Sequence, residues 1–76
     1  MDLRKRVHLG LLGEAGRKGV TELPYGEAKQ RICGQLNVQR HEWNDAISTL
    51  KRDNLIEFPS KKRIRLDVPS LHDVFQ

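Results

Sequence analysis

The sequence has 76 residues, which is enough for one small domain. Apolar residues make up 37% of the chain and charged residues 32%, and the mean hydropathy is -0.65. This balance excludes a wholly disordered chain, and the lack of a run of about 18 apolar residues excludes a membrane-spanning segment. The basic residues near the start have no apolar run behind them, so we expect no signal peptide.

Cys33 is the only cysteine. A single thiol cannot form an internal disulfide or a cysteine zinc site, so the fold must depend on packing alone. We therefore expect a reducing, intracellular location, which would be the cytoplasm for a prokaryotic or viral protein and the nucleus for a eukaryotic one.

The charge pattern favours a polyanionic partner. Fourteen Lys and Arg residues against ten Asp and Glu residues give a net charge of +4, with an isoelectric point near 9.6. Residues 59–66 are the most basic part of the chain, because no acid interrupts Lys61, Lys62, Arg63 and Arg65. A run of this kind is either a solvated loop or a surface for phosphates.

Residues 2–15 predict a first helix. Asp2 is suited to cap this helix and Gly16 to end it. Gly10 and Gly13 weaken it and indicate either the close approach of another element or a helix that depends on tertiary contacts. The residues that share its apolar face are Leu3, Val7, Leu11 and Ala15.

Residues 20–23 alternate between apolar and polar side chains, which predicts a short strand that Pro24 ends. A helical period resumes over residues 25–36. Asn37 follows this second helix and tolerates the left-handed conformation that a tight turn requires. The apolar face of the helix is formed by Tyr25, Ala28, Ile32 and Leu36.

Residues 39–53 give the strongest helical pattern, with Trp43, Ala46, Ile47 and Leu50 in one narrow stripe. We expect Trp43 to be the central packing residue of the domain. Its stripe would pack against Leu3, Val7, Leu11, Ile32 and Leu36.

Beyond Asn54 the apolar period changes from about 3.6 to 2. This change predicts strands over residues 55–58 and 63–68, joined by a turn over 59–62. On the second strand one face is apolar, with Ile64, Leu66 and Val68.

We assign residues 1–68 to one domain and residues 69–76 to a C-terminal tail, in which Ser70 and Asp73 suit the capping box of a short helix. Five apolar residues remain after the core is filled, and leaving them all exposed would be unusual for a small monomer. Either the tail folds back on the first helix or the two form a homodimer interface, and the dimer is favoured. These residues are Leu9, Leu12, Leu71, Val74 and Phe75.

The order helix, strand, helix, turn, helix and β-hairpin resembles the winged helix-turn-helix family over residues 3–68. The segment 32–43 resembles the helix-turn-helix of that family, with Asn37 in the usual glycine position. The segment 50–57 resembles the junction of recognition helix and wing, with Asn54 where glycine is common. The resemblance implies a mainly α fold with a small antiparallel β-sheet, built as a three-helix core plus a β-hairpin wing.

The resemblance also implies a function, which is sequence-dependent binding of double-stranded DNA by a small transcriptional regulator. Helix 39–53 would enter the major groove and the wing, residues 59–65, would meet the backbone. The implied base-contacting residues are Arg40, His41, Asn44 and Ser48, whose side chains suit base edges. The implied backbone-contacting residues are Lys51, Arg52, Lys61, Lys62, Arg63, Arg65, Arg17 and Lys18. Glu42 and Asp45 depart from an ideal DNA surface, because carboxylates repel phosphates.

Other interpretations stay open. The polar face of helix 39–53 is a solvated surface in the simplest alternative. A winged helix also serves as a protein–protein interaction module of larger complexes, in which an apolar patch would matter more than the basic residues. RNA binding is a third alternative to DNA.

The sequence predicts no enzyme, no cofactor and no metal site. The glycines of the first helix lack the preceding strand and the Gly-Lys-Ser/Thr of a phosphate-binding loop. His41 and Asp45 are one helical turn apart but have no third ligand. Nothing places a histidine beside Cys33, so a structural thiol is the better interpretation.

Overall fold

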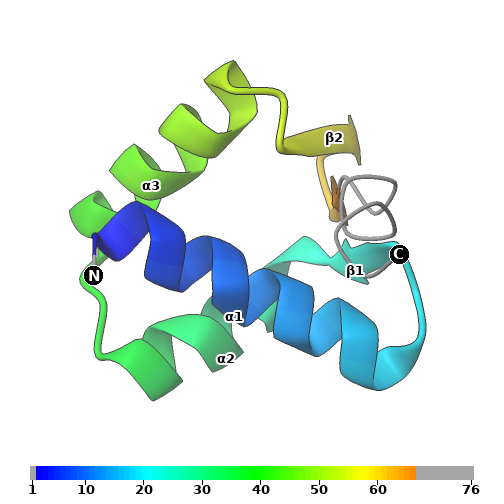
Figure 1. Ribbon diagram of the computed structural model, residues 1–76, viewed down its shortest axis with the longest axis horizontal. Coiled ribbons are helices and arrows are strands. Elements are labelled where there is room, and N and C mark those ends of the chain that lie inside the picture. The colour runs from blue at the N-terminus through cyan, green and yellow to red at the C-terminus, as the bar shows by residue number, and fades with distance from the viewer. Residues whose placement is uncertain (1, 67–76) are drawn as a thin grey trace.

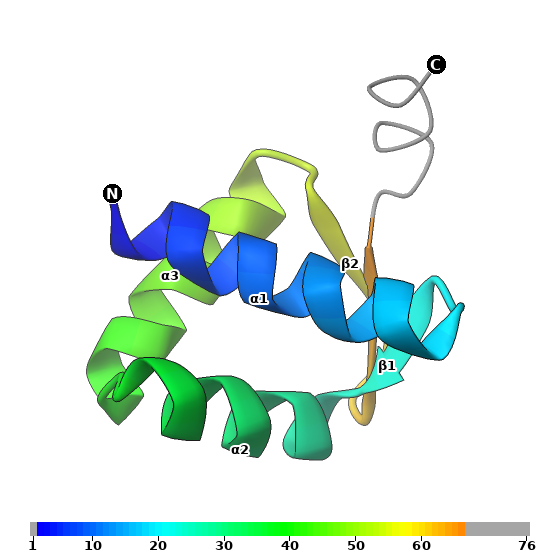
Figure 2. The ribbon, with the colours of Figure 1, turned by 60° about the horizontal axis from the view of Figure 1, so that its bottom comes forward.

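The computed structural model describes residues 2–66, which form three helices and one three-stranded antiparallel sheet. α1 packs on both α2 and α3, and its C-terminal half passes beside the sheet (Figures 1 and 2). The expected class, mainly α with a small antiparallel sheet, is confirmed. The elements in chain order are α1 (Leu3–Lys18), β1 (Glu22–Pro24), α2 (Tyr25–Leu36), α3 (Arg40–Arg52), β2 (Ile56–Ser60) and β3 (Arg63–Leu66).

The core fills the space between the three helices and the inner face of the sheet. Leu3 and Leu36 were expected inside it, but both are only partly buried and pack against its edge. The expected core residues that the structure buries are Val7, Leu11, Ile32, Trp43, Ile47 and Leu50, and the sheet adds Leu23, Ile56, Ile64 and Leu66.

α1 runs to Lys18, so the expectation that Gly16 ends it is wrong. Gly19 ends the helix instead, in the left-handed conformation at φ 67°, and its N–H donates to the carbonyls of Ala15 and Gly16. A glycine inside a helix costs only about 1 kcal/mol, so Gly16 weakens α1 without stopping it. The close approach expected at Gly10 is confirmed, because a Cβ there would lie 3.4 Å from Ile32 of α2. At Gly13 it is not found, because nothing lies within 4 Å of such a Cβ.

Two asparagines make the tight turns that join α3 to its neighbours. Asn37 caps the end of α2 at φ 55°, and Asn54 follows α3 at φ 61°. Both positions had been interpreted as substitutes for glycine, and both carry the left-handed conformation that asparagine tolerates. These turns set the direction in which α3 leaves α2 and in which the chain enters β2.

The sheet has the order β1-β3-β2, with β3 in the centre. β1 covers residues 22–24 rather than 20–23, and β2 continues through Pro59 to Ser60, where a turn had been expected. β2 is an edge strand with an irregular register between Glu57 and Ser60, so a proline there removes no central hydrogen bond. β3 is described up to Leu66, and the rest of the expected strand 63–68 lies outside the described residues.

The apolar residues left outside the expected core divide into three groups. Leu12 packs against the core and is partly buried, so the expectation that it lies outside the core is wrong. Leu9 lies on the outer face of α1 with 55% of its surface exposed. The tail 69–76, with its expected short helix and its three apolar residues, lies outside the described residues. The homodimer stays a prediction, and no helix within residues 2–66 is both long and apolar enough to cross a membrane.

Trp43 is fully buried and its indole Nε1 donates to the Tyr25 hydroxyl at 2.9 Å. We expect Trp43→Ala to lower the free energy of unfolding by about 3–5 kcal/mol, because it leaves a large cavity in a small core. Trp43→Phe keeps an aromatic ring there and should cost clearly less. Urea unfolding measures both, and a near-native midpoint for Trp43→Ala would contradict the assigned packing of α3.

Candidate functional site

α3 carries its polar side chains on the face turned away from the core. All four residues expected to contact bases are exposed there: Arg40, His41, Asn44 and Ser48. The stripe opposite them is buried, from Trp43 to Leu50. The structure therefore presents the four side chains together to the solvent on one helix of 13 residues.

The flank of α3 that faces the β2–β3 hairpin is basic. At about 100° per residue, Arg40, Asn44 and Lys51 fall within a sector of roughly 40°. Lys51 Nζ lies 5.7 Å from the centre of the Phe58 ring on β2, which is a cation–π distance. This contact joins the basic flank of α3 to the hairpin.

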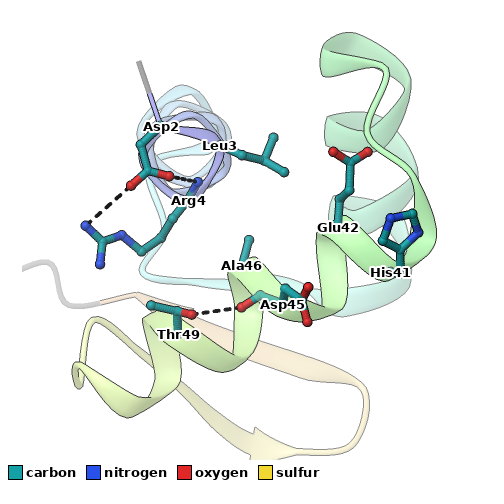
Figure 3. Close-up of a pocket in the computed structure, with 8 residues that line it drawn as sticks. All are labelled: Asp2, Leu3, Arg4, His41, Glu42, Asp45, Ala46 and Thr49. Carbon is teal, nitrogen blue, oxygen red and sulfur yellow. Dashed lines mark hydrogen bonds and ion pairs between the residues drawn. The ribbon is translucent and has the colours of Figure 1, made fainter.

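The opposite flank of α3 is acidic and faces the start of α1. A shallow groove between the two helices is lined by Asp2 and Arg4 of α1 and by His41, Glu42 and Asp45 of α3, among others (Figure 3). The Glu42 carboxylate accepts a hydrogen bond from the Gln39 backbone N–H at 3.1 Å and so caps α3. His41 also lines this groove, so among the four exposed side chains it is the one that lies beside carboxylates.

The hairpin carries two kinds of cation. Lys61 and Lys62 form the turn between β2 and β3 and are exposed. Arg63 Nε donates to the Glu22 carboxylate at 2.9 Å, and Arg65 lies 3.4 Å from the carboxylates of both Glu22 and Glu57. The two lysines are free to meet an anion, whereas the two arginines are held across the sheet.

Arg17 and Lys18 lie in the last turn of α1 and are not brought together with α3. The start of α1 packs on α3, and 14 residues of helix place Lys18 about 20 Å further along the axis. Arg17 is also hydrogen-bonded to Glu14, which is almost fully buried and lies 3.7 Å from Arg31 of α2. Sequence reasoning missed this bridge, because Glu14 reads as an ordinary polar residue of a surface helix.

The Lys and Arg side chains of residues 2–66 form two groups, those with a carboxylate within ion-pair distance and those without one. Six arginines have one: Arg4, Arg17, Arg31, Arg52, Arg63 and Arg65. Three cations without one cluster around Phe58 and the hairpin turn: Lys51, Lys61 and Lys62. Arg40, also without one, lies on the same flank of α3, about 16 Å further along the helix. The others without one, Lys5, Arg6, Lys18 and Lys29, are spread over α1 and α2. Half of the unpaired cations among the described residues thus lie on α3 and the hairpin turn.

Two aromatic residues beside this cluster were not singled out from the sequence. The Tyr25 and Phe58 rings meet edge to face, with centroids 5.4 Å apart, and both are partly buried. Their apolar periodicity indicates core packing, and only the tertiary structure brings them next to Lys51 and Lys61.

The described residues bear on two candidate chemistries named in the sequence analysis, a metal site and a reactive thiol. No three His, Cys, Asp or Glu side chains within residues 2–66 are arranged to hold a metal ion. Burial raises the pKa of the Cys33 thiol, with a smaller opposing effect from Lys29, so the reactive thiolate is disfavoured at neutral pH. The arrangement suits binding of an anion to an exposed surface.

No protein-family model matches the sequence, and comparison with curated proteins and with solved structures gave no match.

The ion pairs that join Glu22 to the hairpin depend on pH. Its hydrogen bond from Arg63 holds the pKa of this carboxyl below the ordinary value of 4.5, against a smaller effect of desolvation. The stabilisation is therefore complete above about pH 4.5 and is lost as the pH falls through the folded-state pKa. We expect Glu22→Gln to lower Tm near neutral pH and to differ less from the wild type near pH 3.

Thermal melts across this range measure the effect, and Glu57→Gln, which removes a more exposed partner of Arg65, is the control. An equal Tm difference between Glu22→Gln and wild type at both ends of the range would contradict the role of Glu22.

Proposed function

We propose that the protein is a winged helix-turn-helix protein that binds double-stranded DNA, as a small transcriptional regulator does. The observation that carries the proposal is the cluster of unpaired cations at the end of α3 and the hairpin turn, Lys51, Lys61 and Lys62, with Arg40 on the same flank of the helix. A duplex presents closely spaced phosphates, and neutralising them releases counterions, so such a cluster favours DNA over a neutral partner.

The architecture supports the same proposal. α2 and α3 are joined by a short turn at Asn37, and α3 leads directly into a β-hairpin. A helix of 13 residues is about 20 Å long and about 10–12 Å wide, which fits a major groove about 12 Å wide. The hairpin, as the wing, then lies beside the groove that α3 occupies.

The proposed roles follow the charge of each flank. Arg40 and Asn44 read bases, because Arg pairs bidentately with guanine and Asn with adenine. Ser48 lies one helical turn after Asn44, on the exposed face of α3. The phosphate contacts come from Lys51, Lys61 and Lys62, with Arg52 at the end of α3. Arg63 and Arg65 position the wing through Glu22, whereas Arg17 and Lys18, at the far end of α1 from its contact with α3, are left out of the proposed contacts.

A protein–protein interaction module is the second candidate. Leu9, on the outer face of α1, is the observation that favours it, because 55% of this large apolar residue is exposed. A partner protein or a second copy of the chain would cover it. The two functions make different demands, since only DNA binding requires the basic flank of α3.

The first test asks whether α3 reads bases. An amide NMR titration with mixed-sequence duplex establishes binding, and selection from a random pool gives a preferred site. Arg40→Ala or Asn44→Ala should then cost about 1–3 kcal/mol on that site and much less on scrambled DNA, because only the right base pair matches each side chain. If both variants bind both duplexes as the wild type does, α3 does not read bases, and the protein–protein interaction module becomes the better proposal.

The second test concerns the wing. Lys61→Gln with Lys62→Gln should weaken binding equally on all duplexes and reduce the salt dependence by a slope of about 0.9 per lost phosphate contact. Lys5→Gln with Lys18→Gln is the matched control, because it removes the same charge from α1. A salt series by fluorescence anisotropy compares them, and an equal effect of both pairs would show that only net charge matters.

A further inference from the structure

A hollow opens between the start of α2 and the hairpin turn, lined by Tyr25, Phe58, Ser60 and Lys61. The two aromatic rings form its apolar walls, with their planes at 77° to each other. The Tyr25 hydroxyl accepts the indole N–H of Trp43, which is fully buried. The core therefore fixes one wall of the hollow.

The rim of the hollow carries donors of hydrogen bonds and positive charge. Ser60 Oγ accepts the backbone N–H of Lys62 at 3.3 Å, which leaves its own hydroxyl hydrogen to donate. Lys61 lines the hollow itself, and Lys51 lies over the Phe58 ring from the side of α3. Within the described part of the chain, no carboxylate lines this hollow. Its chemistry suits a group that is apolar on one side and anionic on the other.

We propose that the hollow holds one deoxyribose–phosphate unit of a DNA strand, an inference that rests on the proposed duplex binding. A flat base stacks on the face of an aromatic ring, but the near-perpendicular Tyr25 and Phe58 rings form a corner instead. A saturated, non-planar sugar fits such a corner. Lys51 and Lys61 then meet the phosphates on either side of that sugar.

This hollow would hold the DNA strand that runs between the wing and the groove occupied by α3. Contacts to sugar and phosphate carry no sequence information, so they fix the position of the duplex and leave base selection to α3. Phe58→Leu should therefore lower affinity by about three- to tenfold, as expected for loss of one aromatic contact, and equally on preferred and scrambled duplexes. Phe58→Tyr keeps the ring and should bind as the wild type does.

The direct readout is an intermolecular NOE experiment on the full chain with duplex DNA. We expect NOEs from the Phe58 and Tyr25 ring protons to deoxyribose protons. If the wild type binds duplex but shows no such NOEs, and folded Phe58→Leu binds normally, the proposed sugar–phosphate site is wrong and DNA binding stands. If the wild type does not bind duplex at all, both the proposed function and the proposed sugar–phosphate site are wrong. Ring shifts produced by deoxyribose 5-phosphate alone at similar concentration would indicate a metabolite site and overturn the strand assignment.

Discussion

The hydrogen bond between Trp43 and Tyr25 is the constraint on which the surface of α3 depends. A buried indole N–H without a partner is costly, and Tyr25 Oη satisfies it at 2.9 Å. The bond ties α3 to the start of α2, and the buried stripe from Trp43 to Leu50 sets the rotation of the helix about its axis. Tyr25 in turn contacts Phe58 of β2, and Phe58 contacts Lys51 of α3. The core residue thus also decides that Asn44 and its neighbours face solvent on the hairpin side.

Ion pairs then decide where positive charge is available. Exposed pairs add little to stability, but each carboxylate beside an arginine reduces the charge which that arginine offers to a partner. Glu22 forms ion pairs with two arginines of β3, Glu14 forms one with Arg17, and Asp53 lies 3.4 Å from Arg4. A net charge of +4 therefore understates the asymmetry of the surface. Lys61 and Lys62, at the tip of the hairpin, have no carboxylate partner among the described residues.

Local patterns were sufficient for much of this fold and insufficient for the charge distribution. The bounds of α2 and the conformation of Asn37 follow from helical period and from asparagine's tolerance of positive φ. The end of α1 was missed because a glycine inside a helix resembles a glycine that ends it. The pairing of Glu22 with Arg63 joins residues 41 positions apart, and no local period reports such a contact. The basic and acidic flanks of α3 likewise depend on which neighbours the tertiary structure places beside each.

The acidic flank of α3 has its origin in folding rather than in binding. Glu42 caps α3 through the Gln39 N–H, and Asp2 caps α1 through the Arg4 N–H at 3.0 Å. Carboxylates at helix starts are favoured by the helix dipole, so these two stabilise the elements that they precede or begin. In the proposed complex they would repel the phosphates on the α1 side of the groove. The duplex would then lie toward the flank with Lys51 and the hairpin, so that the same carboxylates that start two helices also select one orientation of the DNA.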